Sequence, residues 1–202
     1  MHIQIAFRIL GSLLMIFSLT MLPPILVSWL FADGVSIIFI DTFALTFSAG
    51  AVLFGLFRKH HQEMRTKDGF LITFLFYMAL GCFGAIPMVQ ESGINLSWPD
   101  ALFESFSGLT TTGATVITGI DDLPASILFY RQQLQWLGGM GIIVLAVAIL
   151  PMLGIGGMQL YRAETPGPLK DSKLTPRIKQ TAVALWSIYI GLTVACAAAY
   201  WI

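Results

Sequence analysis

Five apolar stretches, each close to the length of a membrane span, take up most of this 202-residue chain. A helix needs roughly 20 apolar residues to cross the hydrocarbon core of a bilayer, so each stretch predicts a membrane-spanning helix. The predicted spans cover about Ile5–Leu30, Asp41–Phe57, Gly69–Val89, Ile127–Leu153 and Thr181–Ile202. Only 11% of the residues are charged, which is too few for a soluble domain. We therefore expect an all-α polytopic membrane protein.

The first two spans carry signals that refine their geometry. Pro23 and Pro24 interrupt the first apolar stretch, so we expect the first helix to bend there. Residues 31–40 are predicted to form a short connector, and Asp41 is a suitable N-cap for the second helix.

The basic residues fall on one side of the membrane when the N-terminus is placed in the cytoplasm, as the positive-inside rule requires. The inner segments then hold Arg8, Arg58, Lys59, Arg65, Lys67, Arg162, Lys170, Lys173, Arg177 and Lys179. Only Arg131 lies outside, and we expect its long side chain to reach the outer interface. This alternation holds only if the segment from Gln90 to Tyr130 returns to the side of the membrane that it left. Two full spans would also return it, but the segment is too short and too polar for them, so we expect a re-entrant segment.

That returning segment contains a run of small and hydroxylic residues from Ser105 to Thr115. Irregular backbone at membrane depth is tolerated only where protein buries it or where it lines a water-filled cavity. A ring of backbone carbonyls can replace the water shell of an ion, and small side chains leave the backbone accessible. Gly113 accepts backbone angles that other residues resist. The run therefore predicts a pore loop, and the alternative is a polar external loop.

A short helix is predicted to lead into this run. Ser97 can cap it, Pro99 lies in its first turn, and Asp100 occupies the capping-box position. The C-terminal end of the helix carries partial negative charge, which favours a cation there. An acid inside a membrane is costly and often functional, so we expect Glu104 to accept hydrogen bonds from filter amides or to pair with Arg131. The alternative places Glu104 at the level of the lipid headgroups.

Three glycines in the fourth predicted span, Gly138, Gly139 and Gly141, leave one helix face almost without side chains. Such a face lets a neighbouring helix or pore helix approach closely. A gating hinge at these glycines is the alternative.

The sequence lacks the patterns typical of an enzyme. Its three histidines have no carboxylate or cysteine at metal-ligand spacing, and serines in the spans lack a histidine or lysine partner. Cys82 and Cys196 lie inside apolar runs and suggest neither a disulfide framework nor a metal site. We therefore expect no catalytic residues and no covalent cofactor.

Four segments of the chain match a known family: Phe103–Thr115, Leu128–Gln132, Gln135–Ile142 and Gln159–Pro168. They resemble the membrane subunit of bacterial Trk-type potassium uptake systems, the TrkH family. The resemblance implies helix–pore loop–helix repeats of the potassium-channel-like superfamily, four in one polypeptide, with two preceding transmembrane helices. It implies potassium binding by the filter backbone, which falls here on Thr111, Thr112 and Gly113. Residues expected to support the filter are Thr110, Ala114 and Glu104.

The resemblance also implies a location and partners. We expect a bacterial inner-membrane protein surrounded by lipid, a homodimer in its full-length form, a cytosolic nucleotide-binding regulatory subunit called TrkA, and no nucleic acid. The expected domains are residues 1–68 with two helices and a cytoplasmic loop, 69–153 as the first helix–pore loop–helix unit, 154–180 as a cytoplasmic connector, and 181–202 as the first helix of a second unit. The connector either contacts the regulatory subunit or the next repeat, or is a solvated linker.

One pore loop cannot enclose an ion, so we expect the sequence to be the N-terminal part of a potassium uptake protein, supplying one of four pore loops. Two alternatives remain open. The pore could serve another monovalent cation such as sodium or ammonium, although sodium-passing members of the family carry serine at the position that Gly113 matches. The chain could also be a non-conducting structural or regulatory membrane fragment.

Overall fold

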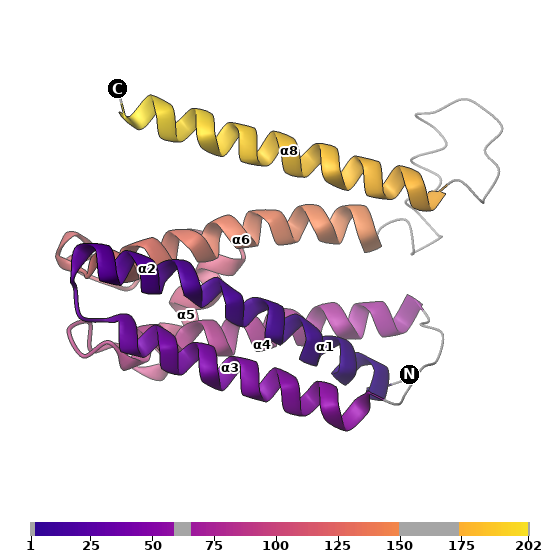
Figure 1. The fold of residues 1–202 in the computed structure, drawn as a ribbon, viewed down its shortest axis with the longest axis horizontal. Coiled ribbons are helices and arrows are strands. Elements are labelled where there is room, and N and C mark those ends of the chain that lie inside the picture. Colours follow the sequence, from indigo (N-terminus) through magenta and orange to yellow (C-terminus); the bar gives the residue numbers. More distant parts are fainter. Residues whose placement is uncertain (1–2, 59–65, 150–173, 202) are drawn as a thin grey trace. The chain divides into compact units, whose positions relative to one another are not determined.

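The structure, a computed structural model, describes residues 3–58, 66–149 and 174–201, and within these ranges it contains helices and no strand (Figure 1). Four of the described helical stretches are long and apolar enough to cross a membrane: Ile3–Phe31, Ser36–Phe57, Leu71–Gln90 and Val183–Trp201. The helix α6 (Ala125–Ile149) covers the described part of the fourth predicted span. The expected all-α membrane protein is thus confirmed. The chain divides into two compact units, Met1–Gly138 and Gly139–Ile202, and the second holds α8 (Leu174–Trp201).

The first span is broken where its prolines predicted a bend. It consists of α1 (Ile3–Ser18), the 3-10 turn η1 (Leu19–Met21) and α2 (Leu22–Phe31), with both prolines in the first turn of α2. Pro24 has no backbone N–H to donate to the carbonyl of Thr20. The side-chain amide of Gln133 on α6 donates to that carbonyl oxygen instead, at 2.8 Å. The break in the first span thus becomes a contact with α6.

The second span begins earlier than the sequence predicted. Helix α3 (Ser36–Phe57) places Asp41 inside the helix, so the prediction of an N-cap there was wrong. The connector is closed by Asp33, whose carboxylate accepts hydrogen bonds from the Val35 amide at 3.1 Å and from the Ser28 hydroxyl. With the turn completed there, the apolar residues from Ser36 onward can join the helix.

Asp33 also reaches the start of α6, because its second oxygen accepts the backbone N–H of Ser126 at 2.9 Å. A carboxylate at a helix N-terminus satisfies an otherwise free N–H and interacts favourably with the helix dipole. Burial raises the pKa of the Asp33 carboxyl, but the hydrogen bonds from Ser28, Ser126 and Val35 outweigh it, so this pKa lies below the ordinary value of 3.8.

Helices α1 and α3 lie side by side and touch through glycines (Figure 1). A Cβ atom added at Gly11 would lie 2.6 Å from the backbone nitrogen of Phe54, and one added at Gly50 would lie 2.7 Å from the carbonyl oxygen of Gly11. Contacts below 3.0 Å are essentially never seen for real Cβ atoms. The backbones therefore meet at a distance that only glycine permits, as in many membrane helix pairs.

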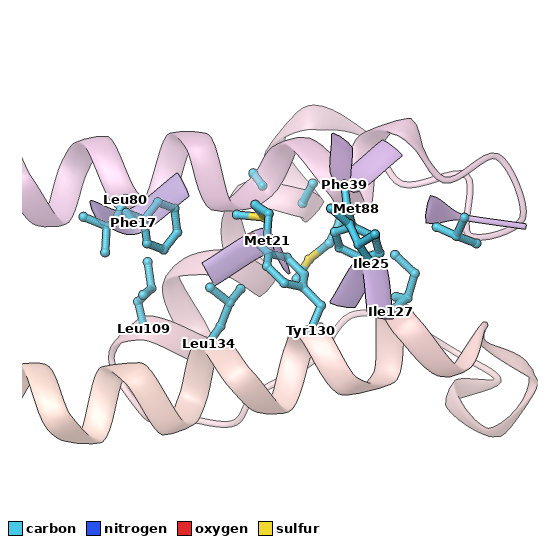
Figure 2. Packing of buried hydrophobic residues seen from close by; sticks show 13 residues of the cluster. Phe17, Met21, Ile25, Phe39, Leu80, Met88, Leu109, Ile127, Tyr130 and Leu134 are labelled. Carbon is cyan, nitrogen blue, oxygen red and sulfur yellow. The ribbon is translucent and has the colours of Figure 1, made fainter. Parts of the chain in front are cut away.

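The segment after α4 (Thr66–Gln90) returns to the end of the bundle that it left. Figure 2 shows Met88 from the end of α4, Phe39 from the start of α3 and Tyr130 from the start of α6 in one buried cluster. The rings of Phe39 and Tyr130 meet edge to face, with centroids 5.4 Å apart. Because α4 ends where α6 begins, the intervening helix α5 (Trp98–Leu109) and the loop after it form a re-entrant element, as predicted.

Candidate functional site

Helix α5 begins as its sequence predicted. The Ser97 hydroxyl accepts the Asp100 backbone N–H at 3.4 Å and donates to the Asp100 carboxylate at 2.5 Å, while Pro99 lies in the first turn. Its twelve residues give a length of about 18 Å, somewhat more than half of the hydrocarbon thickness. A helix of this length delivers its C-terminal end to the interior of a bilayer.

Two glycines on α4 seat α5. A Cβ atom at Gly81 would lie 2.5 Å from the Cε1 atom of the Phe106 ring, and one at Gly84 would lie 2.5 Å from the hydroxyl oxygen of Ser105. The Tyr130 hydroxyl donates to the Gly84 carbonyl at 2.9 Å and joins α6 to the same place. Neither glycine was predicted to matter, although small residues on one face of a membrane helix let a neighbouring helix approach closely.

The chain turns sharply at the C-terminal end of α5. The backbone N–H of Thr111 donates to the Gly108 carbonyl at 2.9 Å. The N–H groups of Thr112 and Gly113 both donate to the Ser107 carbonyl, at 2.9 and 3.4 Å. These bonds satisfy carbonyls that a helix end otherwise leaves free, and they turn the N–H side of the candidate filter toward α5.

Backbone angles in this turn show why a glycine is placed there. Gly113 has a φ of 73° and Thr111 a φ of 57°, both in the left-handed region. Glycine adopts this conformation at little cost, whereas a residue with a Cβ is strained by about 1–2 kcal/mol. Strained backbone of this kind is common at functional sites.

The carbonyl oxygens of Thr111, Thr112 and Gly113 accept no hydrogen bond from any residue that the structure describes, and all three residues are exposed. Thr110 supports the turn from the side, since its hydroxyl donates to the Phe106 carbonyl at 2.8 Å and lies 2.8 Å from the Thr112 hydroxyl. The three carbonyls are therefore oxygen atoms available to a cation near the negative end of the α5 dipole.

Ala114, the other residue expected to support the filter, is held by its carbonyl oxygen, which accepts the Ser107 hydroxyl at 2.6 Å. Ser107 thus holds the loop through both its backbone and its side chain. Ser107 was not among the predicted site residues; its place as a serine in the last turn of a predicted pore helix is the signal that could have indicated it.

Glu104 is buried in α5, with 3% of its surface exposed. One carboxylate oxygen accepts the Thr115 hydroxyl and the Val116 backbone N–H, each at 2.6 Å. The other accepts the Nε and Nη2 groups of Arg131 at 3.2 and 2.8 Å. Of the two arrangements expected for Glu104, the pair with Arg131 occurs, and the backbone amide that it binds is that of Val116, beyond the proposed filter.

The structure pairs Arg131 with Glu104, while its expected reach to the outer interface stays a prediction. Its side chain is only 12% exposed, and it is held by the Glu104 carboxylate and by the Thr115 hydroxyl, which accepts from Nη2 at 3.0 Å. A buried carboxylate requires a partner, and this requirement decides the place of the arginine.

The three glycines of α6 have different surroundings. A Cβ atom at Gly138 would lie 2.8 Å from the carbonyl carbon of Leu109 at the end of α5. In the second unit, one at Gly139 would lie 2.6 Å from the hydroxyl of Tyr189 on α8. Gly141 lies in the same helix, which is continuous through all three positions. A hinge at these residues stays a prediction.

The chain is similar to known cation transport proteins. The family model described as TrkH, cation transport protein, matches residues 36–202. The Trk system potassium uptake protein TrkH of Halomonas elongata is 64% identical over 200 residues, covering 99% of this chain and 42% of the relative. TrkH of Escherichia coli K12 is 56% identical over 201 residues, covering 100% of this chain and 42% of the relative.

The crystal structure of the potassium transporter TrkH from Vibrio parahaemolyticus has a similar fold, with a TM-score of 0.84 and 52% identity. The match covers 100% of this chain and 40% of that structure, so the chain spans about two fifths of the length of its relatives. These matches confirm the resemblance carried by the four sequence segments. The chain belongs to the TrkH family of cation transport proteins.

Proposed function

We propose that this protein takes up potassium across the bacterial inner membrane, and that the backbone carbonyls of Thr111, Thr112 and Gly113 form one quarter of its selectivity filter. The observation that carries the proposal is the turn after α5. The N–H groups of this turn are bound to the helix end, while its carbonyls are left to another ligand. Relatives that match nearly the whole chain are named potassium uptake proteins, which supports potassium as the transported ion.

The chemistry of the turn suits a monovalent cation. Dehydrating potassium requires oxygen ligands held at fixed positions, and neutral carbonyls bind such an ion firmly without trapping it. In this proposal each of four loops contributes carbonyls to the ring, and Gly113 matters for its backbone freedom. The proposed protein has a cytoplasmic N-terminus, is a homodimer and is regulated by a cytosolic nucleotide-binding subunit of the TrkA type.

Replacing Gly113 by serine in the complete gene product tests the filter. The new Cβ atom would be 3.5 Å from the side-chain nitrogen of Gln135, so space is available and the strain comes from the positive φ. A serine should tilt a carbonyl or offer its hydroxyl instead, giving a looser site. A loss of 1.4 kcal/mol in preference for potassium over sodium would change selectivity about tenfold. Competitive rubidium and sodium flux into proteoliposomes measures this preference.

Gly119→Ser is the matched control. Gly119 has a φ of 71°, and its added Cβ would lie 3.5 Å from the Asp122 carboxylate, yet it lies outside the proposed filter. Gly113→Ser should reduce selectivity at wild-type protein levels and Gly119→Ser should not. Wild-type selectivity in Gly113→Ser would exclude this segment as the filter.

A further inference from the structure

We propose that Glu104 and Arg131 are positioning residues for ion selectivity, because their buried pair fixes the chain immediately after the filter. This inference rests on the proposed function. The two charged residues lie outside the filter, and they act on it through their contacts with the loop.

The pair joins three separate parts of the first unit. Glu104 lies on α5, Arg131 lies on α6, and both hold Thr115 in the loop between them. Glu104 also accepts the backbone N–H of Val116 at 2.6 Å. The loop is therefore attached to both helices at the same point.

The carboxylate is fully used in this arrangement. One oxygen receives a hydroxyl and a backbone N–H, and the other receives two N–H groups of one guanidinium. Hydrogen bonds between charged groups are short, strong and directional, and the two-pronged arginine contact also fixes orientation. The carboxylate side chain is 1% exposed, so water does not weaken these bonds. Because the pair is neutral, it adds no net charge beside an ion.

The loop is held at the proposed filter and directly after it. At the filter, the N–H groups of Thr111–Gly113 are bound to the end of α5. After it, Ser107 holds the Ala114 carbonyl and Glu104 holds Thr115 and Val116. Gly113 is two residues from Thr115, and consecutive Cα atoms are separated by a fixed distance of about 3.8 Å. A displacement of Thr115 therefore has too little chain in which to dissipate before it reaches the filter carbonyls.

Two conservative variants separate positioning from folding. Glu104→Gln keeps the shape of the side chain, but its amide turns a donor toward either the Arg131 guanidinium or the Val116 N–H, both of which can only donate. Arg131→Lys keeps the charge but loses the fork that reaches both Glu104 and Thr115. Asp100→Asn is the matched control, since it neutralises an acid on the same helix at its N-terminal cap, away from the loop.

The experiment measures three quantities for the complete gene product in proteoliposomes: protein amount, maximal rubidium flux, and rubidium preference over sodium. We expect Glu104→Gln to lower the preference about tenfold and Arg131→Lys to lower it several-fold, with Asp100→Asn unchanged. The double variant should lose less than the product of the single losses, because the two residues act through one contact.

Wild-type preference in both single variants, whatever their protein amount, would overturn the proposal and leave the pair a folding element. Should Glu104→Gln fail to accumulate, Arg131→Lys alone decides the outcome. Gly113→Ser separates the two hypotheses: if it alters preference while the pair variants do not, only the positioning role fails. If Gly113→Ser also leaves the preference unchanged, the filter assignment itself fails.

Discussion

Replacing Gly138 by alanine tests the close approach between α6 and the end of α5. The added Cβ atom would lie 2.8 Å from the Leu109 carbonyl carbon and 3.0 Å from the Gly108 carbonyl oxygen. Ordinary contact begins at 3.4 Å, and the obstructing atoms are backbone atoms that no rotamer change can move. The end of α5 and α6 must therefore move apart.

The size of the effect follows from where the displaced atoms lie. Forcing an extra methyl group into a packed site costs about 1–3 kcal/mol. The same movement shifts the Gly108 carbonyl, which accepts the Thr111 N–H, so the proposed filter turn moves with the helix end. If part of this cost appears in ion preference rather than stability, 1.4 kcal/mol corresponds to about a tenfold loss. We therefore expect Gly138→Ala to lower both the unfolding temperature and the selectivity.

Thermal unfolding of the detergent-purified complete gene product and competitive rubidium flux measure the two effects. Gly55→Ala is the control, because a Cβ atom at Gly55 on α3 meets nothing within 4 Å. It should leave both properties unchanged or raise stability by up to about 1 kcal/mol, as alanine replaces glycine inside a helix. Wild-type stability and flux in Gly138→Ala would refute the close approach and the argument built on it.

Three further outcomes are expected. Asp33→Asn should remove about 1 kcal/mol of stability at neutral pH. That difference should vanish as the pH falls below 3.8, because protonation removes the contribution of a carboxylate whose pKa is lowered in the folded protein. Thermal unfolding at several pH values measures the difference in stability. A difference that persists at low pH would contradict the explanation. Gly81→Leu should reduce the amount of protein in the membrane, since α5 packs against that glycine, whereas an equal loss in Gly55→Leu would contradict this explanation. In a cysteine-free background, a cysteine at Asp122 should react with a membrane-impermeant thiol reagent from outside and one at Arg58 should not, and the reverse pattern would refute the orientation.

The hydropathy pattern and short-range capping chemistry predicted the fold well. Apolar length depends only on local composition, so the spans could be recognised directly. The Ser97–Asp100 cap is also local, because all its hydrogen bonds lie within four residues. The re-entrant course followed from charge and length, since a segment too short for two spans must return.

Predictions failed where a partner far along the chain decides the structure. Asp41 looked like an N-cap because no local pattern indicates that Asp33 closes the connector and reaches Ser126, 93 residues later. The burial of Arg131 was not predicted because its partner, Glu104, lies 27 residues before it. Gly81 and Gly84 were missed for the same reason, as what makes them necessary is the side chains of α5.

The turn after α5 combines local and distant interactions. Its residue types could therefore be recognised as a pore loop from the sequence, whereas the side chains that hold it in place could not. A carbonyl can face an ion only if the N–H groups of the same segment are bound elsewhere. The helix end supplies acceptors for the N–H groups of Thr111, Thr112 and Gly113, so a glycine in a run of threonines at the end of a short helix is a visible signal. At Val116 the helix end is out of reach, and the acceptor is a buried side chain, Glu104, whose charge then requires Arg131. One backbone N–H beyond the turn thus connects the loop to both charged residues of the buried pair.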